Sequence, residues 1–335
     1  MEDGPVSALT LLITVAVHVG LAGMLAGCAS FMWLRSAESG WGRNMAQRSG
    51  HVLRSAVWLA AMSQLVLLWL DAAAMGDLPL IDAWPAIPTV LGQTQFGRAW
   101  LVGFGALIVV AIAAAFSKTI GGLRLARTIA GIGVFACSRS AASHAGANGM
   151  LAPAVFVDAG HLVMMGLWSG AVFVGAFGFP AKPVGQDAAD RLDCAAWLRM
   201  LSTAATWSLV GVASTGLFNA WRGLGTFANL VSTAYGETLL VKLALVGAAV
   251  ALGGVNRFVV MPRWLAALQT REAPVDQAQR SFVRVLRIEA FMLLGALVAA
   301  AFLSASAPPD QDNQRKTSGM SSEARTTCSP SAMPA

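Results

Sequence analysis

Imidazole, carboxylate and thioether groups gather within one short segment of an otherwise apolar chain. Between positions 143 and 170 lie two of the four histidines, an aspartate and two adjacent methionines: His144, Asp158, His161, Met164 and Met165. Thioether and thiolate ligands favour Cu(I), and imidazole binds Cu(I) or Cu(II), whereas magnesium and calcium prefer oxygen ligands. The residue types in this segment therefore predict binding of copper rather than of a hard cation.

Helical spacing places several of these groups on one face. At ~100° per residue, Asp158, His161 and Met165 fall within one stripe, and Met164 lies beside it. Two glycines of the same segment, four residues apart, fall on the opposite side, where small residues allow membrane helices to pack closely. The segment is thus expected to have one face for chemistry and another for packing.

Depth along the predicted helices adds two more candidates. His161 follows Pro153 by eight residues, which at ~1.5 Å per residue is roughly 12 Å below the outer membrane surface. His18 also lies in the outer half of its helix, and Cys137 precedes His144 by seven residues. We expect a copper site in the outer half of the membrane with three histidines and four secondary candidates: His18, His144, His161, Met165, Met164, Cys137 and Asp158.

Each candidate also has a purely structural interpretation. A membrane histidine can simply bond a neighbouring helix, and Met164 and Met165 could be lipid or core contacts. Asp158 could cap its helix or pair with Lys242, and His51 is expected to face headgroups or water. Ionisable residues within a membrane are nevertheless costly, which makes them functional candidates by default.

The elements that must position these residues are long apolar helices. Of the 335 residues, 56% are hydrophobic and only 12% are charged, about half the charged share of ordinary soluble domains. Each apolar block has roughly the ~20 residues that a membrane helix needs, and a lone strand could not satisfy its backbone in lipid. We predict an all-α polytopic membrane protein with eight transmembrane helices at about 6–34, 52–74, 98–116, 123–142, 153–179, 197–220, 237–260 and 283–306.

The distribution of basic residues predicts the orientation of these helices. Most Lys and Arg fall in the loops after the first, third, fifth and seventh helices, for example Arg43, Lys118, Arg191 and Arg271. Positive loops stay in the cytoplasm, so both termini are expected outside it, on the opposite side of the membrane. Because the charges are spread over four loops, they do not predict a nucleic-acid site. Motifs for hydrolysis or ATP use are absent, so an enzyme is not expected.

Two motifs recur in the same order, which predicts a tandem duplication of a four-helix unit. The spacing H-x4-G-x3-G occurs at His18, Gly23 and Gly27 and again at His161, Gly166 and Gly170. Thr94-Gln95-Phe96-Gly97 is followed later by Thr233-Ala234-Tyr235-Gly236. Halves at about 5–145 and 150–306 would be parallel copies, related by an axis along the membrane normal.

Two other segments are expected to lie outside the membrane. The polar tail at 307–335 cannot bury an apolar face, so a disordered periplasmic segment is predicted there. The loop at 261–282 contains two prolines and mixed charge, which predicts a solvated connector. Beside it, Arg257 and Glu289 are expected to pair across a helical hairpin or to serve a cytoplasmic gate.

In sequence order, the motifs resemble those of the CopD family of bacterial inner-membrane copper-resistance and copper-uptake proteins. The matching positions are Thr94, Phe96, Gly97 and Arg98; Ser143, His144 and Ala145; Asp158, His161, Trp168, Ser169 and Gly170; Thr233, Tyr235, Gly236 and Lys242; and Asn256, Arg257, Arg287, Glu289, Pro308 and Pro309. The resemblance covers about residues 5–309. Glu237 departs from it, because many members carry a basic residue there.

The resemblance implies that copper is taken from the periplasm towards the cytoplasm, with His18, His144 and His161 as candidate ligands. A separate CopC-like periplasmic protein is the implied donor, since no such domain is fused to this chain. Two alternatives remain open on the residues alone. Paired histidines such as His18 and His161 could hold a b-type haem for electron transfer, or the protein could hold copper for another membrane protein without transporting it.

Overall fold

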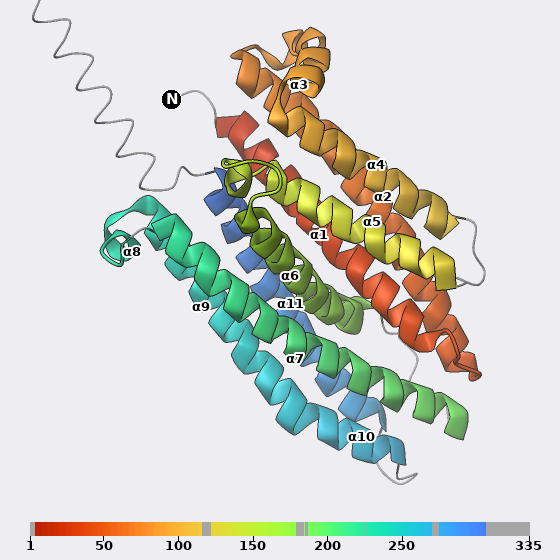
Figure 1. Cartoon of the computed structure of the whole chain (residues 1–335). Helices are drawn as coiled ribbons and strands as arrows, with labels where there is room; N and C mark the ends of the chain where they lie inside the picture. The colour runs from red at the N-terminus through yellow and green to blue at the C-terminus, as the bar shows by residue number, and fades with distance from the viewer. Residues whose placement is uncertain are drawn as a thin grey trace, which may run out of the picture.

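The computed structural model of the chain is a bundle of long helices (Figure 1). It describes residues 4–115, 122–178, 184, 187–224, 226–269 and 275–305. The long helices are α1 (Gly4–Leu34), α2 (Gly40–Gly76), α4 (Gln95–Ala115), α5 (Gly122–Ala141), α6 (Pro153–Phe177), α7 (Ala188–Leu224), α9 (Ala234–Val255) and α11 (Val275–Ala305). The short elements are η1 (Leu80–Asp82), η2 (Trp84–Ala86), α3 (Ile87–Gln93), η3 (His144–Gly146), α8 (Asn229–Ser232), η4 (Asn256–Val260) and α10 (Met261–Gln269).

The prediction of an all-α multi-pass membrane protein is confirmed. Within the described residues, seven helices are long and apolar enough to cross a membrane, and each predicted block has a long helix. The eighth long helix, α5, is not among these seven, because Arg124, Arg127 and Arg139 lower the hydropathy of its 20 residues. The predicted polar tail at 307–335 lies outside the described residues.

Two helices begin well before their predicted starts, and the start of α7 stabilises the first turn of α2. α2 begins at Gly40 instead of 52, and α7 begins at Ala188 instead of 197. The Ser39 hydroxyl caps α2 by accepting from an amide of its first turn at 2.9 Å. From α7, the Asp190 carboxylate accepts from the amide of Trp41 at 2.8 Å. Acceptors at a helix N-terminus satisfy its free amides, so polar residues extend both helices beyond the apolar blocks.

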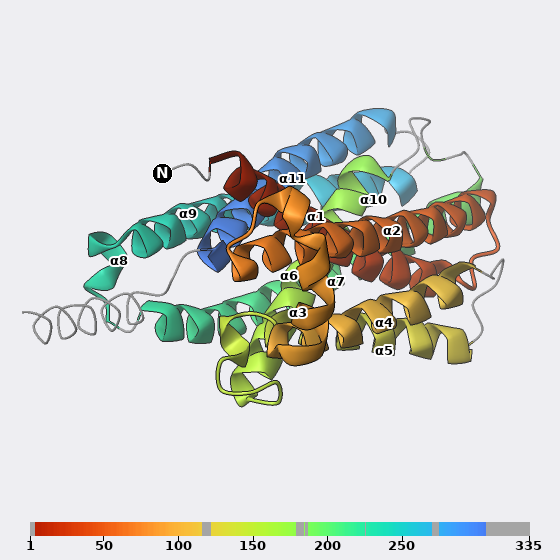
Figure 2. The ribbon, with the colours of Figure 1, turned by 90° about the horizontal axis from the view of Figure 1, so that it is seen from above.

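α1 and α6 form the centre of the bundle. α2, α4 and α5 lie on one side of this pair and α7 and α9 on the other, and α11 packs against both α6 and α9 (Figure 1). Seen from above, α8 and the start of α1 lie at one end and α10 lies towards the other (Figure 2). The start of α1 and the end of α11 are at the same end of the bundle, as an even number of crossings requires (Figure 1).

Three contacts within the two predicted halves correspond, whereas the packing of α2 on α4 has no equal between α7 and α9 among the described residues. α1 packs against α2 and α5, as α6 packs against α7 and α11, and α4 packs on α5 as α9 packs on α11. Between the halves, α1 contacts α6 and α11, and α6 contacts α5. Each central helix therefore touches the last helix of the other half.

The recurring Thr-x-aromatic-Gly motif forms the same junction twice, between a short helix and a long one. The Thr94 hydroxyl accepts from the Gly97 amide at 2.8 Å and donates to the Val90 carbonyl at 2.7 Å. The Thr233 hydroxyl likewise accepts from the Gly236 amide at 3.1 Å and donates to the Asn229 carbonyl at 2.6 Å. Because a Cβ at either glycine would overlap carbonyl oxygens of the short helix, the motif has a structural role.

The prediction of a solvated connector at 261–282 is wrong for most of that segment. α9, η4 and α10 continue as one helical run to Gln269, and α11 begins at Val275. Trp264 is fully buried and its ring packs on that of Phe282, with centroids 4.9 Å apart. The apolar side chains of this stretch outweigh its prolines and charges, because α10 can bury them against α11.

Candidate functional site

The close contact between α1 and α6 sets two histidines at the same depth. An added Cβ at Gly166 would lie 2.8 Å from Leu25 Cδ1, and one at Gly170 would lie 2.8 Å from Ala26 Cβ. The two glycines therefore face α1, as their side of the helix predicts. Because α1 and α6 run in the same direction along this contact, His18 and His161, each about one turn before it on its own helix, lie at one level.

His18 is buried on α1, with one ring nitrogen unsatisfied. Its side chain is 8% exposed, and its Nδ1 has no hydrogen-bond partner among the described residues. Its ring interacts electrostatically with His161, Arg139 and Lys242. A buried nitrogen without a partner is costly unless something binds it, so this atom is a candidate ligand.

His161 is held by a hydroxyl on α7 in a way that defines its tautomer. Its Nδ1 lies 3.0 Å from Thr215 Oγ1, and that hydroxyl donates its proton to the carbonyl of Gly211 at 2.6 Å. The hydroxyl must therefore accept from the imidazole, which places the proton of the neutral ring on Nδ1. The lone pair of the neutral ring is then on Nε2, and a backbone hydrogen bond to Val212 also holds the ring.

Asp158 links α6 to α7 and to the basic residues around the histidines. Its Oδ1 accepts from Asn219 Nδ2 at 3.0 Å, and its carboxylate interacts electrostatically with Lys242 and Arg222. One predicted alternative, a direct pair of Asp158 with Lys242, stays a prediction. The other, that Asp158 caps its helix, is wrong because α6 begins at Pro153 and Ala152 precedes it as the N-cap residue.

The remaining predicted ligands lie around this pair or apart from it. Met164 contacts α7, where an added Cβ at Gly211 would lie 3.0 Å from its sulfur. Met165 and Cys137 are both half-buried, on α6 and α5. His144 is exposed on η3, because α5 ends at Ala141 and does not continue to it as a helix. Among the described residues, no three His, Cys, Asp or Glu side chains are grouped closely enough to hold a metal ion.

Gln64 and Asp71 of α2 were not predicted as site residues, although they lie beside Arg139 of α5. Gln64 of α2 is 1% exposed, and its Oε1 lies 3.5 Å from Nη1 of Arg139 on α5. Arg139 also interacts electrostatically with Asp71 of α2 and with Asp158. Gln64 and Asp71 lie within a predicted apolar helix, and a polar side chain in such a position is the signal that could have identified them.

The donor types around His18 and His161 are those that suit a soft cation. His18 has an unpaired Nδ1, the tautomer of His161 puts its lone pair on Nε2, and the thioether of Met165 lies one turn further along α6. Imidazole and thioether together suit copper. Asp158 offsets part of the positive charge of Lys242 and Arg139, which would otherwise repel a cation entering this region.

Comparisons with known proteins match the chain to copper resistance proteins. Residues 6–154 match the family model described as copper resistance protein D-like, N-terminal domain, and residues 195–303 match that of copper resistance protein D. A curated copper resistance protein D from Pseudomonas syringae pv. tomato is 27% identical over 318 residues, which cover 89% of this chain and 96% of the relative. No solved structure matches the chain.

Proposed function

Since the chain belongs to the copper resistance protein D family, we propose that it transports copper across the bacterial inner membrane, from the periplasm towards the cytoplasm. The observation that carries this proposal is the pair of buried imidazoles on α1 and α6, His18 and His161, each with one ring nitrogen available. A carrier without an enzymatic step needs such a site, which takes up its substrate and releases it unchanged.

The path begins at the outer end of the bundle. His144 is exposed on η3, where it can receive copper from a separate CopC-like donor in the periplasm. Met164, Met165, Cys137 and Asp158 line the region through which the ion reaches the buried pair or offset charge there. The uneven distribution of basic loops supports an inner membrane location with both termini outside.

The two halves, at about 5–145 and 150–306, derive from duplication of one four-helix unit. Their corresponding helix contacts and the identical threonine junctions support this origin. The site lies where the first helices of the two halves meet. A small shift of one half against the other would then expose the site to the periplasm or to the cytoplasm in turn.

Copper accumulation in cells tests this function. Cells that produce His18→Ala or His161→Ala are expected to accumulate less copper than wild-type cells, because each change removes one of the two imidazoles. His51→Ala is the matched control, since that histidine is exposed and lies next to Arg54 on α2. Accumulation at the wild-type level in both site variants, with equal amounts of protein in the membrane, would refute the site.

Two further measurements separate the alternative functions. Flux of copper into liposomes that contain only this protein is expected, and a protein that only holds copper for a partner would give none. Purified protein is expected to lack a Soret band. Such a band that disappears in the His18 and His161 variants would instead identify them as axial ligands of a b-type haem.

A further inference from the structure

The start of α7 joins the two halves of the bundle at the end away from the histidine pair. α2 belongs to the first half and α7 to the second, and both helices start at this end (Figure 1). The junction lies beyond Leu34, where α1 ends, and Leu34 follows His18 by sixteen residues, or roughly 24 Å of helix. In the proposed orientation this inner end is the cytoplasmic one.

Two carboxylates of α7 bind free amides at the start of α2. Asp190 Oδ1 accepts from the Trp41 amide at 2.8 Å, and Asp193 Oδ2 accepts from the Ser39 amide at 3.3 Å. The two aspartates are three residues apart, so one face of α7 presents both. The first amides of a helix have no partner within it and carry partial positive charge, which makes a carboxylate a favourable acceptor there.

Buried side chains close the junction behind these hydrogen bonds. Trp41 of α2 and Trp197 of α7 meet edge to face, with centroids 6.2 Å apart, and are 8% and 1% exposed. Cys194 lies between Asp193 and Trp197 on the chain and is fully buried. Separation of α2 from α7 would expose these apolar side chains to water, so the closed arrangement is favoured in the absence of a ligand.

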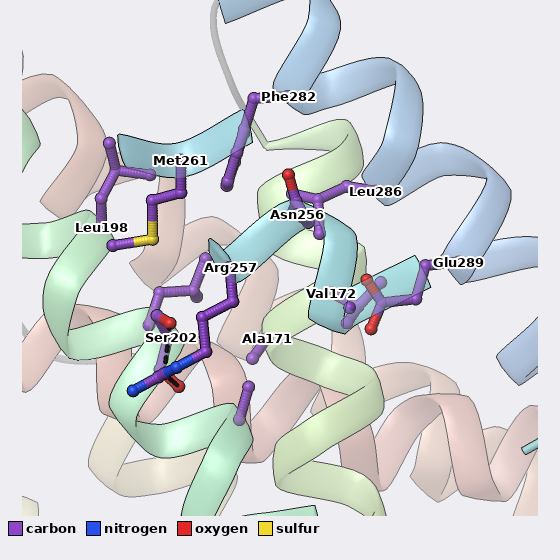
Figure 3. Close-up of a pocket in the computed structure, with 13 residues that line it drawn as sticks. Ala171, Val172, Leu198, Ser202, Asn256, Arg257, Met261, Phe282, Leu286 and Glu289 are labelled. Carbon is purple, nitrogen blue, oxygen red and sulfur yellow. Dashed lines mark hydrogen bonds between the residues drawn. The ribbon is translucent and has the colours of Figure 1, made fainter. Parts of the chain in front are cut away.

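A different face of α7 forms one wall of a small pocket. The pocket has a volume of about 60 Å³ and lies between α6, α7, η4, α10 and α11 (Figure 3). Leu198 and Ser202 line it from α7, and Arg257 of η4 donates to the Ser202 carbonyl at 2.9 Å. Figure 3 shows the guanidinium turned towards Ser202 and Glu289 on another wall. Arg257 thus bonds α7 instead of pairing with Glu289 as predicted, and a movement of α7 would reshape this pocket.

The junction of α2 with α7 can open more easily than the contact between α1 and α6. Asp190 and Asp193 are half-buried, so water that reaches them can replace the amides as their partners. α1 and α6 meet instead at Gly170, where an added Cβ would overlap the Ala22 carbonyl. Water cannot replace such close van der Waals packing. A movement of one half against the other should therefore pivot at α1 and α6 and separate α2 from α7.

We propose that the junction of α2 with the start of α7 is the inner gate of the copper path and is closed in this structure. This proposal rests on the proposed transport function. For copper to leave towards the cytoplasm, the hydrogen bonds of Asp190 and Asp193 must break and Trp41 must separate from Trp197. Copper can open the gate only as far as it binds the open state more tightly than the closed one.

A covalent link across the junction tests the gate. In a variant that keeps Cys137 as its only native cysteine, Gly40→Cys and Asp190→Cys put one thiol on each helix. Gly40 is exposed, and its added Cβ lies 3.8 Å from Asp190 Oδ1. A short bifunctional methanethiosulfonate should link the two thiols and reduce copper flux into liposomes to background, and dithiothreitol should restore it. Gly40→Cys alone, treated in the same way, should keep its flux. Unchanged flux in the fully linked protein would overturn the proposal.

Reactivity of Cys194 measures the opening directly. Asp190→Ala with Asp193→Ala removes both acceptors, so a soluble maleimide should label Cys194 about tenfold faster than in the wild type in nanodiscs. Mass spectrometry of the labelled peptides gives the rate for each thiol. Cys28, buried on α1, is the control, because a loss of folding would expose it as well. An unchanged rate at Cys194, or equal gains at both thiols, would contradict the gate.

The outcomes also separate this inference from the transport function. Absence of copper flux in the unlinked protein refutes transport, while the maleimide labelling still shows whether Asp190 and Asp193 hold the inner end closed. Flux that continues in the linked protein refutes the gate alone.

Discussion

A buried imidazole can bind a metal only if one ring nitrogen is free and the ring is held in place. His161 meets both conditions through Thr215, which accepts from its Nδ1 and donates to the backbone of its own helix. His18 has the free nitrogen, but no described residue bonds its Nδ1. At the scale of residues, the proposed site thus gives the two imidazoles different roles: His161 would be oriented in advance and His18 would complete the site.

Thr215→Val tests this orientation. Valine keeps the branched shape but cannot accept from Nδ1–H, so His161 should lose its fixed tautomer and copper affinity should fall by about 10- to 100-fold. Competition titration with Cu(I) measures the change. Ser214→Ala is the control, because its exposed hydroxyl bonds the helix backbone in the same way but contacts no histidine. Equal affinities of the two variants would refute the role of Thr215.

The residue types of the site could be predicted, but their partners could not. His161, Asp158 and Met164 stood out because polar and sulfur groups are conspicuous in an apolar helix. Thr215 and Asn219 are small polar residues that membrane helices tolerate anywhere, and only the packing of α7 against α6 makes them functional. His144 was grouped with the others on sequence distance, which says nothing about the loop that leaves it exposed.

At the scale of helices, glycines of α6 let its backbone approach that of α1 closely, beside the two histidines. Gly170 lets α6 approach the backbone of α1, where an added Cβ would overlap the carbonyl oxygen of Ala22. In membranes, small residues at such interfaces stabilise helix pairs through van der Waals contact. On α1, the two glycines with the same four-residue spacing, Gly23 and Gly27, face α2 instead of α6.

Gly170→Ala should separate the two histidines. The backbones of α1 and α6 must move apart to admit the methyl group, which should cost about 1–3 kcal/mol of unfolding free energy and weaken copper binding. Unfolding in mixed micelles and the Cu(I) titration measure the two effects. Gly105→Ala is the control, because nothing lies within 4 Å of its added Cβ. If both variants behave alike, the contact does not position the site.

The ends of the helices could be predicted where an apolar run begins or stops. They could not be predicted where polar residues extend a helix. α2 begins before its apolar run because Ser39 and Asp190 satisfy free amides of its first turn, and the contact with Asp190 joins segments distant in sequence. α10 was predicted as solvated loop because Pro262 and nearby charges outweigh its apolar residues locally. Its burial against α11 became visible only in three dimensions.

At the scale of the molecule, the proposed transport requires that the two halves meet around the site. Whether α5 crosses the membrane decides on which side every later loop lies. Its 20 residues span ~30 Å, the thickness of the hydrocarbon core. Its basic residues are compatible with crossing. Arg124 and Arg127 lie near its inner end, where long side chains reach the interface, and Arg139 is held by Gln64.

Cysteine labelling tests whether α5 crosses the membrane. In a variant without Cys28, Cys137, Cys194 and Cys328, a single cysteine replaces either Asn148, after α5, or Glu38, between α1 and α2; both positions are exposed. With eight crossings and both termini outside, an impermeant maleimide added to intact spheroplasts should label Asn148→Cys only. Glu38→Cys should react only after permeabilisation. Protection of both would mean that α5 does not cross, which would place His144 on the cytoplasmic side and remove the periplasmic entrance to the histidine pair.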